Sequence, residues 1–223
     1  MFRVEMNDEA IPPFWTDERL YPYLDDAQKM FARLTGGIPD GSSDITKVDF
    51  AIDDTSVVID ERILKIRAAY DLTTGETIEV VNYEDMPKFG FRFDGRKGPR
   101  VKFLVIGMDD NARLYPTPNA VGTIQLLVDR LPLAEITADA PDDGLELKPH
   151  HHLHLLHWMK SLAYGNQDAE IFNKSKAQEF EQKFRAYCEQ ARIEKDKAKH
   201  KTRVVTYGGL PVVGRIDDDY RRR

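Results

Sequence analysis

The chain has 223 residues, 41% of them hydrophobic, and its 38 acidic and 32 basic residues give a net charge of −6. This apolar content excludes wholesale disorder, and the length suits one domain with an insertion or two small domains. The acidic balance argues against a dedicated duplex-DNA binder, whose affinity comes largely from neutralised phosphates. The single cysteine, Cys188, excludes an intramolecular disulfide and fits a reducing compartment.

Neither a signal peptide nor a membrane-spanning helix is expected. The first ten residues include Glu5, Asp8 and Glu9 and contain no apolar run. No stretch approaches the roughly 18 apolar residues that a transmembrane helix requires.

The first predicted element is a helix that begins after Thr16. Thr16 is a suitable N-cap, and Asp17 and Glu18 occupy the first turn, where the helix dipole favours acidic side chains. Apolar residues then recur at helical spacing. Pro22 lacks a backbone donor, so the helix is expected to bend there or to begin after it. Gly36-Gly37 is expected to end the helix.

Residues 48–137 follow a different pattern, with apolar residues alternating at period two and turn signals roughly every ten residues. Thr73-Thr74-Gly75 separates residues 66–72 from 77–81, which predicts a hairpin. Further strands are expected from alternation around residues 89–93, 101–105 and 124–128. The pattern as a whole predicts a small antiparallel β-sandwich or barrel.

Helical periodicity returns after a loop at residues 138–149. Leu155 and Met159 lie on one apolar face of a helix that Gly165-Asn166 breaks or bends. Asn173 is a good N-cap for a second, longer helix. The apolar stripe of this second helix includes Phe180, Phe184 and Tyr187. Glu181 with Arg185 and Glu179 with Lys183 form charge pairs at i,i+4 spacing that support the helix.

The predicted architecture is α+β, with four segments. Residues 1–47 supply the N-terminal helix of a helical bundle, and the helix pair at 138–199 completes it. Residues 48–137 form the inserted β module. Residues 200–223 contain Gly208-Gly209 and three terminal arginines, which is typical of an extended tail.

Five of the six histidines lie at positions 150–157. His150, His154 and His157 share one helical stripe, a spacing that could hold a metal ion, as in a histidine-metal hydrolase. Catalytic zinc helices usually add a glutamate near the pair, and none lies between these histidines. The stripe also lies opposite Leu155 on the helical wheel. The favoured interpretation is therefore a polar face or a surface between subunits.

No other pattern indicates a catalytic, cofactor or metal site, so the chain is not expected to be an enzyme. Cys188 lies on the apolar side of its helix and is expected to act as a small hydrophobe. Residues 95–100 are glycine-rich and basic but lack the spacing of a phosphate-binding loop. Asp53-Asp54 and Asp217-Asp218-Asp219 lack the spacing of an EF-hand.

Three stretches resemble phage head-to-tail connector adaptors, in the same order along residues 14–195. The first is Phe14-Trp15-Thr16-Asp17-Glu18-Arg19-Leu20 with the segment at 23–28, which is similar to their first helix. The second, Leu114-Tyr115-Pro116-Thr117-Pro118-Asn119, looks like their Leu-Tyr-Pro-x-Pro strand signature. The third covers residues 152–159, Ala163-Tyr164 and Gln167-Asp168-Ala169, before a long helix with a Phe stripe.

This resemblance implies a structural virion protein that assembles into a homo-oligomeric ring of about twelve subunits, because an adaptor docked on the portal must match a closed cyclic symmetry. Such a ring joins the portal protein to a downstream tail protein, a nozzle or tail tube. It extends the channel through which DNA passes without sequence-specific binding. The implied location is the head–tail interface of the virion, with the host cytoplasm as the site of assembly.

The C-terminal tail is expected to dock on the portal, as it does in the adaptors that the chain resembles. Its β-branched residues suit strand addition to the edge of a partner's sheet, although a tail without a role is the alternative. The expected docking residues are Arg203, Val204, Val205, Thr206, Tyr207, Val212 and Val213. A tail-completion or tail-tube protein is the structural alternative to the adaptor, and binding to the tail tube rather than the portal would indicate it.

Overall fold

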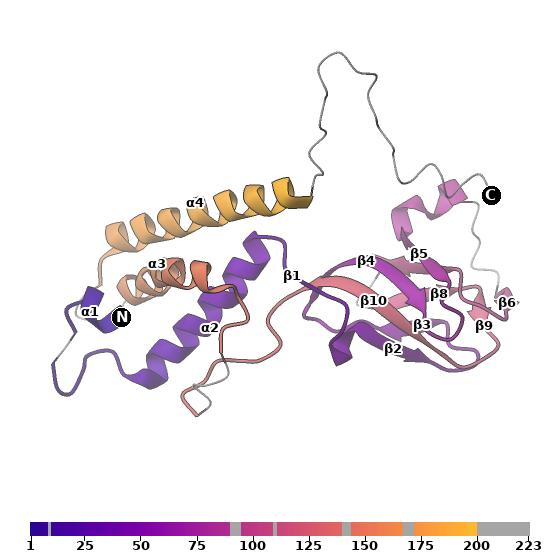
Figure 1. Cartoon of the computed structure of the whole chain (residues 1–223), viewed down its shortest axis with the longest axis horizontal. Coiled ribbons are helices and arrows are strands. Elements are labelled where there is room, and N and C mark those ends of the chain that lie inside the picture. The colour runs from indigo at the N-terminus through magenta and orange to yellow at the C-terminus, as the bar shows by residue number, and fades with distance from the viewer. Residues whose placement is uncertain (9, 90–94, 109–110, 140–143, 167–171, 200–223) are drawn as a thin grey trace, which may run out of the picture.

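The computed structural model describes the chain except for residues 9, 90–94, 109–110, 140–143, 167–171 and 200–223 (Figure 1). Helices gather at one end of the molecule and strands at the other. The helices are α1 (Phe2–Glu5), α2 (Asp17–Leu34), α3 (Pro149–Gly165) and α4 (Lys174–Lys199). Two short 3₁₀ helices, η1 (Asp44–Thr46) and η2 (Tyr83–Phe89), belong to the β part.

The ends of α2 follow the sequence signals closely. Thr16 is the N-cap residue, in an extended conformation, although its side chain makes no capping hydrogen bond. The helix begins before Pro22 and runs through it, so the expectation that it begins after the proline is wrong. Gly36 and Gly37 end it with φ angles of 78° and 81°. A Cβ on Gly37 would lie 2.8 Å from that of Asp129, so this turn also requires a residue without a side chain.

The strands form one eight-stranded sheet and one two-stranded sheet. The larger sheet has the order β1-β10-β4-β5-β7-β8-β3, and β2 also pairs with β10. The smaller sheet pairs β6 with β9. Strand bounds are β1 (Ile38–Asp40), β2 (Lys47–Phe50), β3 (Ser56–Val58), β4 (Ile63–Asp71), β5 (Thr77–Asn82), β6 (Lys97–Gly98), β7 (Phe103–Ile106), β8 (Asn111–Tyr115), β9 (Thr117–Pro118) and β10 (Gly122–Arg130).

The predicted hairpin is confirmed as β4 and β5. Its turn is closed by a 2.7 Å hydrogen bond from the Gly75 N–H to the Asp71 carbonyl, and Gly75 has a φ of 71°. The Asp71 carboxylate accepts the N–H groups of Thr73 and Thr74 at 2.8 and 3.3 Å. These bonds satisfy turn donors locally, as aspartate does in many turns.

The large sheet departs from the expected antiparallel pattern at one place. β5 and β7 are parallel, because the chain between them crosses over through η2 and returns in the same direction. The buried neighbours Leu104 and Val105 in β7 reflect a strand that is covered on both sides. Of the strand expected at residues 89–93, Phe89 belongs to η2 and the rest lies outside the described residues.

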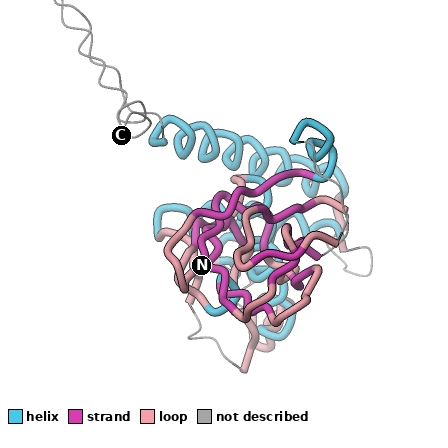
Figure 2. The backbone as a smooth tube through the Cα atoms, turned by 90° about the vertical axis from the view of Figure 1, so that its right-hand side faces the viewer, coloured by secondary structure: helices cyan, strands magenta, loops and turns pink. Residues whose placement is uncertain are grey.

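The mixed α and β architecture is confirmed, and the large sheet curls on itself as a half-barrel (Figures 1 and 2). A sandwich or closed barrel is not confirmed. The sheet also includes β1, which lies ahead of residue 48, the expected start of the β module. That three-residue strand is too short to show a period of two in the sequence.

The two parts of the chain have separate hydrophobic cores. The helical core contains Trp15, Phe31, Leu155 and Phe184 together with the residues packed around them. The β core lies inside the half-barrel and includes Ile124, Leu126 and other aliphatic residues from the strands. Among the described residues, no buried residue belongs to both cores, although Ile38 of β1 packs against the helical core. Polar contacts add to this connection between the two parts.

Helix α4 packs along α3 as the sequence predicted. Phe184 and Cys188 are 0% and 1% exposed, and the ring centroid of Phe184 lies 5.1 Å from that of Trp158. The Asn173 carboxamide oxygen accepts the Lys176 N–H at 3.0 Å, which confirms the predicted N-cap. The charge pairs of Glu179 with Lys183 and Glu181 with Arg185 are also confirmed, at 2.6 and 2.8 Å.

Candidate functional site

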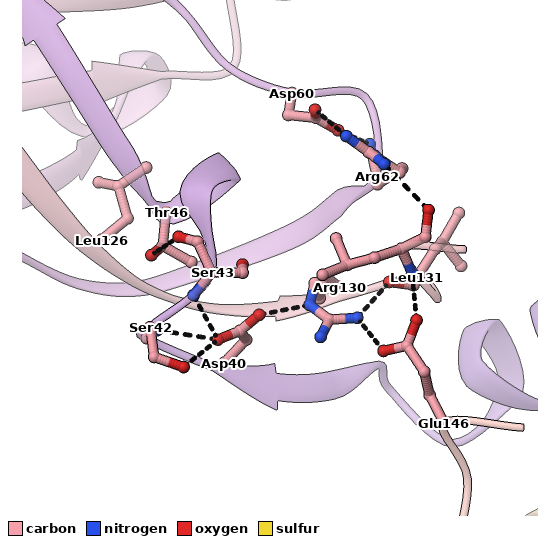
Figure 3. Close-up of polar contacts among 12 residues, drawn as sticks. Asp40, Ser42, Ser43, Thr46, Asp60, Arg62, Leu126, Arg130, Leu131 and Glu146 are labelled. Carbon is pink, nitrogen blue, oxygen red and sulfur yellow. Dashed lines mark hydrogen bonds and ion pairs between the residues drawn. The ribbon is translucent and has the colours of Figure 1, made fainter. Parts of the chain in front are cut away.

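A buried arginine lies where the sheet meets the helices (Figure 3). Arg130 ends β10 and is 7% exposed. Its Nε donates to Oδ2 of Asp40 in β1 at 2.5 Å, and its Nη1 donates to Oε2 of Glu146 at 2.6 Å. Nη1 also donates to the Leu131 carbonyl at 3.0 Å. One guanidinium therefore joins two carboxylates from distant parts of the sequence, in the geometry that arginine favours.

The network continues through Glu146 into the helical core. The Glu146 carboxylate accepts the backbone N–H of Leu133. The Glu146 backbone N–H donates to the carboxamide oxygen of Gln28 in α2 at 2.8 Å, and Gln28 is 1% exposed. The contacts of Arg130 thus connect β1, β10, the segment after β10 and α2. We call Asp40, Arg130, Glu146 and Gln28 the junction network.

The junction carboxylate of Asp40 stays ionised. Burial by itself would raise its pKa, but hydrogen bonds from Ser43, Arg130 and the backbone N–H groups of Ser42 and Ser43 outweigh burial and hold the pKa well below its ordinary value. Burial also disfavours charge on Arg130, yet Asp40 and Glu146 together raise the pKa of its guanidinium. The junction is therefore a compensated set of charges and not an acid–base pair poised for chemistry.

Two further polar contacts lie near the junction, one from α2 to the segment after β10 and one from α4 to the end of α2. Lys29 of α2 lies 2.7 Å from Asp25 and 3.1 Å from Glu135, which follows β10. Lys195 of α4 donates to the Gly37 carbonyl at 2.6 Å and to the Thr35 carbonyl at 3.2 Å. A cation is favoured there, because the last carbonyl groups of α2 carry its negative dipole end.

Two histidines of the stripe pack partly against α4. The His154 ring stacks on Tyr187 with centroids 3.5 Å apart and planes 14° apart. The His157 ring stacks on Phe180 at 6.1 Å. Only His150, among the three, is an exposed residue. The rings of His154 and His157 thus lie partly against α4, a contact that the helical wheel of α3 alone does not reveal.

Burial affects the titration of these rings. It is the main cause that lowers the pKa of His151 to about 4, with nearby His150, Lys148 and His154 contributing. It also lowers the pKa of His154 and His157 from the ordinary value. The Nδ1 of His157 is buried without a hydrogen-bond partner. Neutral imidazoles therefore form part of the α3–α4 contact.

Among the described residues, no three His, Cys, Asp or Glu side chains are grouped to hold a metal ion. Cys188 packs in the helical core as predicted, and burial raises the pKa of its thiol to about 12. Asp53 pairs with Lys97 at 2.7 Å. Within the described part of the chain, no helix is long and apolar enough to cross a membrane.

The predicted docking residues from Arg203 to Val213 lie outside the described residues, as does Asp217-Asp218-Asp219. Sequence reasoning missed the junction network entirely. Its members are spread over more than a hundred positions, from Gln28 to Glu146, and none belongs to a motif. The one available signal was Asp129-Arg130, a charged pair that directly follows the apolar alternation of β10.

No curated protein matches the chain closely enough for comparison. The family of SU10 adaptor proteins matches residues 2–206, which include both cores and the junction network. That match covers the greater part of the chain and agrees with the resemblance of its three sequence stretches to phage adaptors. The chain therefore belongs to the SU10 adaptor protein family, a family of structural phage adaptors.

Proposed function

We propose that the chain forms a ring that docks below the portal, carries the DNA channel onward and receives the next tail protein. The observation that carries this proposal is the match of an adaptor family across residues 2–206. A ring of about twelve copies would satisfy the closed symmetry that docking on a portal requires. The ring would be a virion component at the head–tail interface, assembled in the host cytoplasm.

The architecture suits a protein with a structural role in an assembly. The junction network joins the two parts by buried or partly buried polar contacts, and Lys29 adds an exposed ion pair with Glu135. When the helical part and the β part keep one orientation relative to each other in every copy, identical copies can repeat the same contact around a ring. The net charge of −6 favours passage of DNA without gripping it, because phosphates are repelled on average.

Two parts of the surface serve contacts between proteins in this proposal. Residues 203–207 with Val212 and Val213 dock on the portal by adding a strand to it. The exposed His150 belongs to the contact between neighbouring subunits, whereas His154 and His157 are occupied by α4. Single tails bind weakly because they lose conformational entropy on docking, and a ring of tails gains avidity.

The test is a chain that ends at Lys201. Both cores end before this position, so the shortened chain should keep the circular dichroism spectrum of the full chain. It should fail to co-sediment with portal rings, whereas the full chain sediments with them. Undiminished portal binding by the shortened chain would remove the docking role of the tail. Binding of the full chain to tail tubes and not to portals would favour the tail-completion alternative.

A further inference from the structure

Helix α4 continues past the helical core. Ala191, which is 8% exposed, is the last residue of α4 that belongs to that core. Beyond it, residues 192–198 are exposed with one exception, and even the apolar Ile193 is 44% exposed. Apolar packing therefore does not hold about the last two turns of α4, and helix ends without such packing tend to fray.

Lys195 is the exception within residues 192–198, and it holds this end of α4 on α2. Its Nζ donates to the carbonyl groups of Gly37, Thr35 and Gly36 at 2.6, 3.2 and 3.3 Å. An ammonium group can donate in several directions at once, and the negative dipole end of α2 favours its charge. Because β1 directly follows Gly37, the contact fixes the end of α4 beside the start of the sheet.

Asp196 adds an electrostatic contact with the sheet. The hydrogen bond with Asp129 of β10 is the main cause that raises the pKa of Arg67 in β4, and the nearby charge of Asp196 adds to it. Asp129 is the residue that the turn at Gly37 approaches most closely. The end of α4 therefore lies beside the place where α2, β1 and β10 meet, as its yellow end in Figure 1 shows.

The C-terminal tail begins at residue 200, directly after this end of α4. A segment that starts from a fixed point searches a smaller volume than one on a loose helix end, so its effective concentration at a docking site is higher. In a ring, fixed starting points also place every tail in the same way relative to its own copy, which lets all tails engage a symmetric partner together.

We propose that Lys195 is a positioning residue for the C-terminal tail, because it clamps the last turns of α4 on the end of α2 and so sets where the tail leaves each copy. This inference rests on the proposed function, since the docking of the tail is what gives its starting point a role. Lys195 itself contacts no partner protein and acts through the helix that carries the tail.

The distance between two spin labels in the full chain, measured by electron paramagnetic resonance, tests the clamp. The labels are attached at Arg19→Cys in α2 and Lys197→Cys in α4, both at exposed positions. Cys188 is 1% exposed and burial raises the pKa of its thiol to about 12, so it stays unlabelled. The labelled chain should give one narrow distance distribution, because the end of α4 is fixed on α2.

Lys195→Met is the clamp variant, and Arg192→Met is its matched control in the same turns of α4. Lys195→Met removes the ammonium but keeps an unbranched side chain, and it should widen the distribution by about twofold or more as the helix end comes loose. Arg192 forms an exposed pair with Glu189 at 2.8 Å, so Arg192→Met should leave the width unchanged.

A narrow distribution in Lys195→Met would overturn the proposal, even if the melting temperature fell, because Lys195 would then stabilise only the end of α2. Equal widening by the two variants would overturn it as well, since the clamp would not be specific to Lys195.

Co-sedimentation of the unlabelled variants with portal rings tests the consequence for docking. Lys195→Met should bind portals about fivefold more weakly than the parent chain, and Arg192→Met within about twofold of it. A widened distribution together with undiminished portal binding would overturn the positioning role. The distance measurement contains no portal, so failure of the clamp appears there, whereas failure of the proposed function appears as a parent chain that does not sediment with portals.

Discussion

At the scale of single residues, Arg130 is the side chain on which the joint between strands and helices depends. Arg130→Met should lower the free energy of unfolding by about 3–5 kcal/mol, because it leaves Asp40 and Glu146 buried or partly buried without their cation. Urea unfolding at neutral pH measures the change. Arg100→Met is the matched control, since Arg100 forms an exposed pair with Glu76 and should cost less than about 1 kcal/mol. Equal losses in the two variants would contradict a structural role for the junction network.

The covered histidines predict how stability depends on pH. Their pKa values are lowered in the folded chain, so the unfolded chain takes up protons first as the pH falls below about 6.5. The stability that His154 and His157 contribute is therefore present above that pH and is lost below it. For His151, the loss continues down to its pKa of about 4.

The double variant His154→Phe/His157→Phe keeps rings against Tyr187 and Phe180 but removes both titrations. Between pH 7 and pH 5, urea unfolding should show it losing less stability than the parent chain. A double variant with the parent's pH dependence would show that the two rings are not held neutral by the fold.

At the scale of elements, the separate cores predict that the β module can be removed. A chain that joins Gly37 to Leu145 through a short flexible linker retains Leu145 and Leu147, which pack against the helical core. It also retains the bond from the Glu146 N–H to Gln28. Circular dichroism should therefore still show helix, with a lower melting temperature than the full chain. Complete loss of helical signal would mean that the helices depend on the strands for folding.

The same elements show what a sequence can and cannot reveal. Thr16, Gly36-Gly37 and Asn173 marked helix ends correctly, because capping is local chemistry. The hairpin of β4 and β5 was also predictable from its turn. The parallel pairing of β5 with β7 was not, because it depends on where a long crossover returns.

The packing of the histidine stripe was not predictable for a related reason. A helical wheel reports one helix, whereas burial of His154 and His157 depends on how α4 lies across α3. A merely polar face would predict that substitution of these two histidines by glutamine changes the melting temperature little. The stacked geometry instead predicts that His154→Gln/His157→Gln lowers it, because the ring contacts with α4 are lost.

At the scale of the whole molecule, the central claim is that copies of this chain form a ring that docks on the portal. Electron microscopy of the purified full chain mixed with portal rings tests it most directly. The account predicts a second ring, coaxial with the portal and matched to its symmetry, on the side that faces the tail. Portal particles that remain bare at concentrations where the chain is in excess would contradict the account.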